Sequence, residues 1–216
     1  MTFSTLLLCL ALPLSGLLVH QNALAEASSL ATAVQPATQI TTKQDGVMLT
    51  VQGELNTQVG REVAWSVLTD YTRFPEFVPG VLSNRVLASA NGLKRIAQRG
   101  QVNAGQFGFQ YEGIMQVAET HGEGIDIVFL SGPFKDVRGA WRLSAAQPVK
   151  LSYSMRMDLT KAPFPPPLTP GIAQQQVSAW VGAFAQEMAR RARMQSTVTE
   201  KTQASQTSIS PDGRRK

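Results

Sequence analysis

Two tyrosines, Tyr111 and Tyr153, are the side chains whose type and position could do chemistry. Each belongs to an alternating row of apolar residues and would therefore place a phenolic hydroxyl among apolar neighbours. A buried hydroxyl without a partner costs roughly 1–3 kcal/mol, and a ligand carbonyl or a water could supply that partner. Ligand contact and ordinary core packing are both consistent with this pattern.

Other reactive groups are scarce in this sequence. Cys9 is the only cysteine, and His20 and His121 are the only histidines. Removal of residues 1–25 would leave no cysteine and only His121, which lies in a glycine-flanked turn. These counts argue against a histidine-centred triad, a thiol nucleophile and a site of cysteine or histidine metal ligands. We therefore predict no catalytic residue, no metal and no cofactor.

Residues 1–25 have the pattern of an export signal. An apolar run from Leu6 to Val19 precedes Ala23-Leu24-Ala25, a motif of the kind that a signal peptidase cleaves. Cleavage would start the mature chain at Glu26 and place it outside the cytoplasm, in the periplasm if the source is a Gram-negative bacterium. Residues 26–44 are rich in Ala, Ser, Thr and Gln, which predicts a flexible linker.

The basic charge is concentrated at the C-terminus. The formal net charge is +5, and residues 190–216 hold seven basic and two acidic residues, which accounts for the whole excess. Residues 26–189 are neutral, so the charge pattern does not predict a nucleic-acid-binding face. Residues 196–216 have little to bury and predict a disordered basic tail, which is either solvated or in weak contact with a membrane surface.

Between the two ends, the apolar period changes from two to about 3.6 and back. Alternation over residues 47–52 predicts a first strand, and apolar spacing from Val63 to Leu68 predicts a helix that Pro75 and Pro79 terminate. Short turn signals then separate six predicted strands, which must run antiparallel to their neighbours. These strands cover residues 81–90, 93–101, 107–117, 125–130, 137–143 and 151–159.

The predicted strands 107–117 and 151–159 each have one apolar face, which another element must bury. After the proline-rich segment 162–171, apolar residues from Ile172 to Ala192 trace one stripe of a helix, which can cover these faces. We expect the stripe, the two apolar rows and the two-proline break to surround any ligand. The candidate ligand-binding residues are Phe74, Phe77, Phe109, Tyr111, Met115, Tyr153, Met155, Met157, Trp180 and Phe184.

Two groups of short motifs carry a family resemblance. The first consists of Asp70-Tyr71, Phe74-Pro75, Phe77 and Pro79-Gly80, and the second of Gly132-Pro133-Phe134-Lys135 and Gly139-Ala140-Trp141-Arg142-Leu143. With its order of strands and helices, the region from Gly46 to Met194 resembles the START-type helix-grip (SRPBCC) superfamily. This superfamily includes polyketide cyclase/dehydrase-like and coenzyme Q-binding START domains.

The resemblance implies an α+β helix-grip domain over residues 45–195. The expected fold is a curved six- to seven-stranded antiparallel sheet wrapped around a long C-terminal helix, with two short helices after the first strand. It also implies a cavity between sheet and helix that holds a lipid, an isoprenoid quinone, a sterol or a polyketide.

Three functions are compatible with this fold. The first is binding or carriage of a hydrophobic small molecule. The second is a cyclase or dehydratase that uses the same cavity, which would need a tyrosine or a water for proton transfer. The third is an interaction protein whose interior is filled by its own side chains. The scarcity of acid and base groups favours the first.

Overall fold

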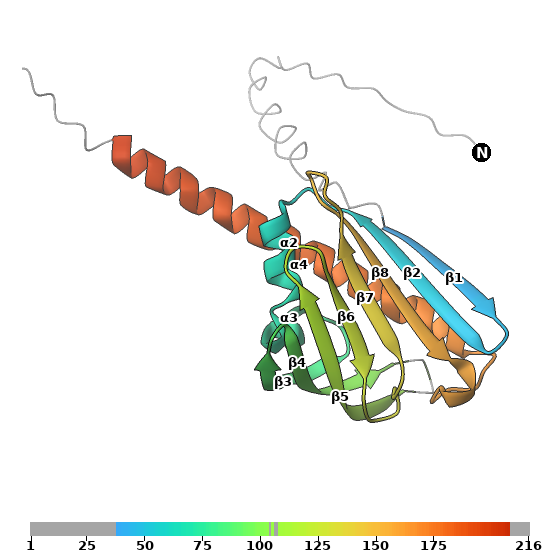
Figure 1. The fold of residues 1–216 in the computed structure, drawn as a ribbon. Coiled ribbons are helices and arrows are strands. Elements are labelled where there is room, and N and C mark those ends of the chain that lie inside the picture. The colour runs from blue at the N-terminus through green and yellow to red at the C-terminus, as the bar shows by residue number, and fades with distance from the viewer. Residues whose placement is uncertain (1–37, 104, 106–107, 208–216) are drawn as a thin grey trace, which may run out of the picture. The chain divides into compact units, whose positions relative to one another are not determined.

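The computed structural model describes residues 38–103, 105 and 108–207. These residues form one antiparallel sheet of eight strands with a long helix against it (Figure 1). The strands are β1 (Thr38–Asp45), β2 (Met48–Asn56), β3 (Val81–Ala90), β4 (Leu93–Val102), β5 (Phe109–Thr120), β6 (Gly124–Phe129), β7 (Arg138–Leu143) and β8 (Lys150–Asp158). The helices are α2 (Arg61–Leu68), the single turns η1 (Tyr71–Arg73) and η3 (Leu159–Lys161), α3 (Phe74–Phe77) and α4 (Thr169–Thr207).

The sheet has the strand order β1-β2-β8-β7-β6-β5-β4-β3. The last strand therefore lies beside β2, and every pair of neighbours is antiparallel. Short turns connect most sequence neighbours, whereas α2, η1 and α3 connect β2 to β3 at the far edge. The predicted helix-grip fold is confirmed, including the short helices after the first predicted strand, which is β2.

The structure differs from the prediction at β1, which makes the sheet eight-stranded instead of six- or seven-stranded. The sequence predicts a flexible linker over residues 26–44, but residues 38–45 pair with β2 from Thr38 opposite Leu55 to Asp45 opposite Met48. Only Ile40 in this strand is half-buried. An edge strand can be held by backbone hydrogen bonds alone and therefore needs no apolar alternation in its sequence.

The final helix is longer than predicted. It continues past Gln195 to Thr207, through part of the segment predicted to be a disordered tail. Residues 183–207 contain neither glycine nor proline, so this polar sequence is able to continue a helix although it has little to bury. The predicted export signal and the last residues of the tail lie outside the described residues.

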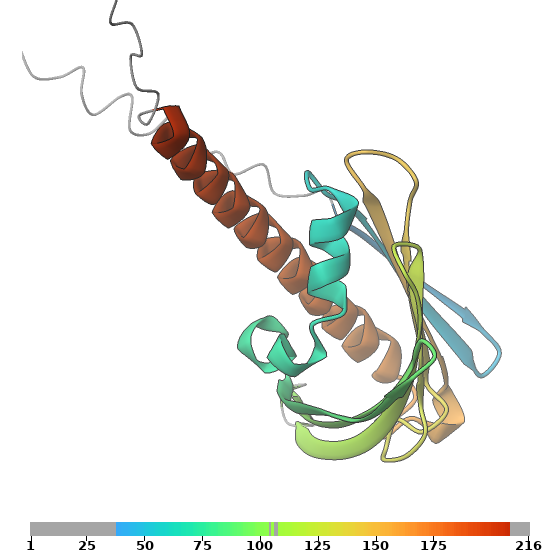
Figure 2. The ribbon, with the colours of Figure 1, turned by 60° about the vertical axis from the view of Figure 1, so that its left-hand side comes forward.

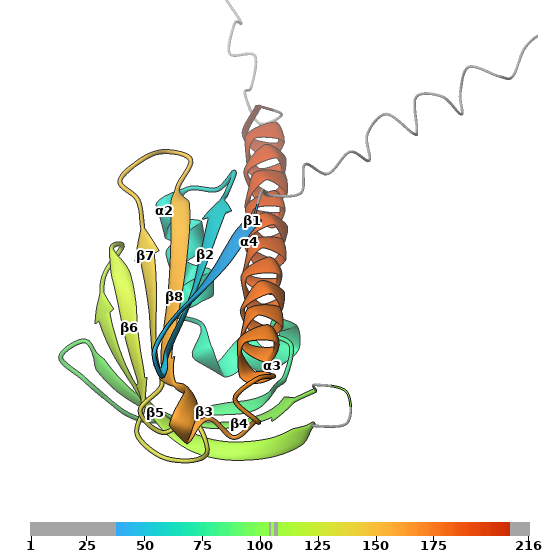
Figure 3. The ribbon, with the colours of Figure 1, turned by 90° about the vertical axis from the view of Figure 1, so that its right-hand side faces the viewer.

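The sheet curves around the N-terminal half of α4, as Figures 2 and 3 show. Helix and sheet approach closely at Gly53 of β2, where an added Cβ would lie only 3.2 Å from Cγ2 of Val181. Val177 and Val181 of α4 are fully buried against this part of the sheet. The apolar stripe of α4 therefore covers the sheet as its spacing predicts. None of the helices in the described ranges is both long and apolar enough to cross a bilayer.

A cluster of ion pairs joins α4 to the segment between α2 and η1. Arg191 Nη2 lies 2.7 Å from Asp70 Oδ2, and the same side chain donates to Glu187 Oε1 over 2.8 Å. Arg190 Nε donates to the other Glu187 oxygen over 2.6 Å. Glu187 is only 6% exposed, so this carboxylate depends on its two arginines for charge compensation.

Glu187 should make the stability of the fold depend on acid pH. Hydrogen bonds from Arg190 and Arg191 lower the pKa of this carboxyl from 4.5 to about 2. Because the folded-state pKa is depressed, the stabilisation is present above about pH 4.5 and is lost as the pH falls towards 2. A depression from 4.5 to about 2 corresponds to at most about 3 kcal/mol, which solvent screening reduces.

Urea unfolding of the wild type and of Glu187→Gln measures this contribution. We expect the difference in unfolding free energy between the two proteins to be largest above pH 5 and to close towards pH 2. The exposed Glu54→Gln serves as the control and should show no such pH-dependent difference. If wild type and Glu187→Gln differ in unfolding free energy by the same amount at pH 6 and pH 2.5, the ionised Glu187 carboxylate does not stabilise the fold.

Candidate functional site

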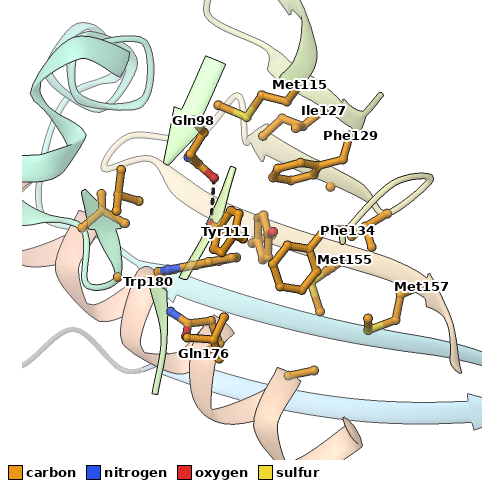
Figure 4. A pocket seen from close by; sticks show the side chains of 18 of the residues that line it. Gln98, Tyr111, Met115, Ile127, Phe129, Phe134, Met155, Met157, Gln176 and Trp180 are labelled. Atoms are coloured by element: carbon orange, nitrogen blue, oxygen red, sulfur yellow. Dashed lines mark hydrogen bonds between the residues drawn. The ribbon is translucent and has the colours of Figure 1, made fainter. Parts of the chain in front are cut away.

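A cavity with a volume of about 130 Å³ lies between the sheet and α4. The sheet supplies one wall, from β4 to β8, and the first five turns of α4 supply the opposite wall (Figure 4). The wall is completed by the segment that contains Pro75 and Pro79 (residues 74–80, the two-proline segment) and by the start of β3. The lining residues there are Phe74, Val78, Gly80 and Val81. An apolar cavity of about 150 Å³ accommodates a benzene molecule, so this one has room for about one ring.

Eight of the ten candidate residues line this cavity. They are Phe74, Tyr111, Met115, Tyr153, Met155, Met157, Trp180 and Phe184. Strand alternation and helix periodicity place these side chains on the faces that the sequence predicts. Their contact with a ligand stays a prediction.

Phe77 and Phe109 do not line the cavity. Phe77 packs edge-on against Phe74 and Phe184, with ring centroids 5.7 and 5.5 Å away. Phe109 packs against Phe134 and Phe164, at 6.1 and 5.3 Å. Both rings therefore lie behind residues that face the cavity, and their role in the structure is to support those residues.

Several lining residues are absent from the predicted set. Trp141 and Phe134 belong to the motifs that carry the family resemblance, but their contribution to a cavity depends on how β7 and the β6–β7 connection fold over the sheet. Gln176 lies on α4 next to the apolar stripe. The sequence does indicate Gln98, because this polar residue lies between Ile96 and Gly100 in the inward-facing row of β4.

A buried polar chain anchors Tyr111 in the cavity wall. Its hydroxyl donates to Gln98 Oε1 over 3.0 Å, and Gln98 Nε2 donates to Asn84 Oδ1 over 3.0 Å. Asn84 Nδ2 in turn donates to the backbone oxygen of Tyr71 over 3.0 Å. Gln98 and Asn84 are 7% and 8% exposed, so each needs these bonds to offset its burial. The chain holds the Tyr111 ring in one orientation.

Glycine 100 makes room for that ring. Gly100 pairs with Tyr111 across β4 and β5. A Cβ added at Gly100 would lie 2.5 Å from the Tyr111 hydroxyl oxygen and ring carbon Cζ, too close for any side chain. The ring of Tyr111 therefore lies flat against the backbone of β4, where it reaches Gln98.

Both cavity tyrosines remain protonated at neutral pH. Burial raises the pKa of Tyr111 to about 12. Burial, together with the neighbouring Tyr111, also raises the pKa of Tyr153 above its usual value. Each hydroxyl is therefore a hydrogen-bond donor and a poor proton source or base.

Two side chains of α4 hold the two-proline segment against the helix. Trp180 Nε1 donates to the backbone oxygen of Pro79 over 3.1 Å, and Gln176 Nε2 donates to the same oxygen over 3.4 Å. Gly80 follows with φ of +82°, and an added Cβ there would lie 2.5 Å from the Gln101 oxygen. The segment is thus fixed on both sides by glycine geometry and by α4.

No charged side chain lines the cavity in the part of the chain that the structure describes. Its polar groups are glutamine amides, one threonine, the tyrosine hydroxyls and the indoles of Trp141 and Trp180. Nowhere in the described ranges do three or more His, Cys, Asp or Glu side chains gather as metal ligands would. The arrangement can enclose an apolar molecule and donate hydrogen bonds to it.

A family model described as "Polyketide cyclase / dehydrase and lipid transport" matches residues 58–185, more than half of the chain. The chain belongs to this family. The match begins just before α2 and ends within α4, so it covers every strand from β3 to β8 and most of the cavity wall. The resemblance inferred from the motifs is confirmed. No curated protein matches the chain in sequence.

Solved structures share the fold of this polyketide cyclase/dehydrase and lipid-transport family member. The Zhui aromatase/cyclase from Streptomyces sp. R1128 aligns with a TM-score of 0.56 at 15% identity, over 67% of this chain and 96% of that one. A START superfamily protein from Mycobacterium smegmatis gives 0.55 at 17% identity, over 67% and 99%. A STAR-related lipid transfer protein fragment from Xanthomonas axonopodis gives 0.54 at 13% identity, over 73% and 95%. At these identities the likeness shows the fold alone.

Proposed function

We propose that this protein binds or carries a hydrophobic small molecule in the cavity between its sheet and α4. The observation that carries the proposal is the wall of that cavity, in which aromatic and aliphatic side chains from α3, α4 and the strands β3 to β8 surround about 130 Å³ of space. Membership in the polyketide cyclase/dehydrase and lipid-transport family and the name of the Xanthomonas lipid transfer protein agree with this proposal.

The cavity volume limits the affinity and the size of the ligand. A single aromatic ring buries about 150–250 Å² and gains about 4–6 kcal/mol from burial, before the costs of association. Binding of such a molecule would therefore be weak, no tighter than roughly tens of micromolar, because the costs of association reduce this gain. A lipid or a polyketide is larger than this cavity, because ligand pockets for drug-sized molecules span about 300–1,000 Å³. Such a ligand would have to displace lining side chains.

The alternative, a cyclase or dehydratase, finds less support. It needs a group that gives or takes a proton near neutral pH. The described lining residues include no carboxylate, histidine or lysine, and burial makes both tyrosine hydroxyls weaker acids. The third function, an interaction protein with a filled interior, is disfavoured by the presence of the cavity.

Recovery of a bound compound tests the proposal. Protein purified from its own host should release an apolar molecule on organic extraction, and native mass spectrometry should show the matching mass adduct. The same protein, unfolded, extracted and refolded, is the control and should lack the adduct until the extract is returned. Repeated purification without any bound compound, and no uptake of the extract, would contradict carriage.

We also propose that the protein is exported, on the basis of the sequence pattern in residues 1–25. N-terminal sequencing of protein from the host should begin at Glu26. A chain that begins at Met1 would overturn this assignment. Contact of the basic tail with a membrane surface remains a separate proposal, for which binding to anionic vesicles with and without residues 208–216 is the direct measurement.

A further inference from the structure

Tyr153 differs from the other two tyrosines of the chain in the state of its hydroxyl. The Tyr71 hydroxyl donates to Glu119 Oε1 over 2.6 Å, and the Tyr111 hydroxyl donates to Gln98 Oε1 over 3.0 Å. The Tyr153 hydroxyl has no hydrogen-bond partner among the described residues, although the side chain is 93% buried (7% exposed).

The free hydroxyl of Tyr153 faces the cavity. Every fully buried side-chain nitrogen or oxygen in the described part of the chain has a partner, so an unpaired hydroxyl must border open space. For this buried residue the space is the cavity that it lines. The absence of a side chain at Gly139 leaves room for the hydroxyl, since an added Cβ would lie 3.2 Å from its oxygen. Trp141 packs on the Tyr153 ring at 4.7 Å and holds it in place.

The cavity also selects against charge. A carboxylate or phosphate enclosed there would lose its hydration, and the described lining residues hold no arginine, lysine or histidine to compensate it. The Tyr153 hydroxyl is a neutral donor, which satisfies a carbonyl or ether oxygen but does not neutralise an anion, and the Tyr111 proton is already donated to Gln98. A carboxylate or a phosphate group is therefore unsuited to a position within this cavity.

We propose that the ligand is an uncharged molecule with a carbonyl or ether oxygen that accepts a hydrogen bond from the Tyr153 hydroxyl. The ring or branched group next to that oxygen fills the apolar space between β8 and α4. This inference rests on the proposed function, because it assigns the polar contact within the same cavity. It makes Tyr153 the residue that distinguishes ligands with an acceptor oxygen from hydrocarbons of the same shape.

Three small probes of matched shape test the inference. Acetophenone carries a carbonyl oxygen, α-methylstyrene has a methylene group in its place, and benzoate carries a negative charge. Titrations followed by NMR should show binding of the first two and at least tenfold weaker binding of benzoate. The readout is the ratio of the acetophenone affinity to the α-methylstyrene affinity, which a general change in cavity packing would not move.

The matched variants are Tyr153→Phe and Tyr111→Phe, which each remove one cavity hydroxyl. We expect Tyr153→Phe to lower the affinity ratio about fivefold and Tyr111→Phe to leave it within about twofold, because the Tyr111 hydroxyl is already committed to Gln98. The infrared carbonyl band of acetophenone bound to the wild type supplies a measurement without a variant. It should lie at a lower frequency than in an alkane solvent.

The possible outcomes separate the two proposals. If α-methylstyrene and acetophenone bind but the ratio is unchanged in Tyr153→Phe, the role of Tyr153 is overturned and the binding function stands. Equal binding of benzoate would overturn the selection against charge. An unshifted carbonyl band would overturn the hydrogen bond even if Tyr153→Phe failed to fold. If neither neutral probe nor any host compound binds, the proposed function itself fails.

Discussion

Replacement of Phe184 by alanine is expected to lower the free energy of unfolding by about 3–5 kcal/mol. The ring is 5% exposed and meets three others edge-on, with centroids 5.2 Å from Phe74, 5.5 Å from Phe77 and 5.0 Å from Trp141. These contacts join α4 to α3 and to β7, so the truncated side chain would leave a void between three elements. Chemical unfolding of the two proteins measures the difference.

Leu168→Ala is the control for this experiment. Leu168 directly precedes α4 and is 41% exposed, so its truncation creates no enclosed void. We expect an effect of less than about 1 kcal/mol. Equal losses in the two variants would show that the aromatic cluster does not hold the helix against the sheet.

Val137→Trp should abolish ligand binding without unfolding the domain. Val137 lies directly before β7 and lines the cavity, and an indole at this position would occupy most of the 130 Å³. Overpacking of a core typically costs about 1–3 kcal/mol, which a domain of this size tolerates. We expect at least a tenfold loss of affinity for a neutral aromatic probe, measured by titration, and loss of the host compound on extraction.

Lys135→Trp provides the matched control, because it adds the same side chain two residues earlier at an exposed position. Binding should be unchanged in this variant, and both variants should keep a cooperative unfolding transition. Full binding by Val137→Trp would mean that the ligand site is not the cavity beneath α4.

The predicted fold rests on patterns that are local in the sequence. Alternation in β8 puts Tyr153, Met155 and Met157 on the buried side and Arg156 on the exposed side, as the structure confirms. The sequence does not predict edge strand β1, because a strand that is held by backbone hydrogen bonds needs no alternation of apolar residues. The helical spacing of α4 predicts its buried stripe, whereas its C-terminal limit depends on weak propensities along a polar segment.

The candidate site was predictable in part. Face assignment was sufficient for Tyr111, Met115 and the β8 row, which line the cavity. It could not exclude Phe109, because a residue on the correct face can still lie behind its neighbours at a curved end of the sheet. Face assignment also could not show that Trp141 lines the cavity. An aromatic residue that lines a cavity and one that only packs in the core have the same alternation in the sequence.

By itself, the sequence determined the order of elements, the buried face of each and the scarcity of acid and base groups in the interior. These properties follow from residue type and spacing, which act over a few positions. Only the tertiary structure decided that Gln98 satisfies Tyr111, that the Tyr153 hydroxyl faces open space and that Asp70 and Glu187 share Arg191. Gln98 and Tyr111, and likewise Asp70 and Arg191, are distant in the chain, and they meet only because strand register and helix packing bring them within hydrogen-bonding distance.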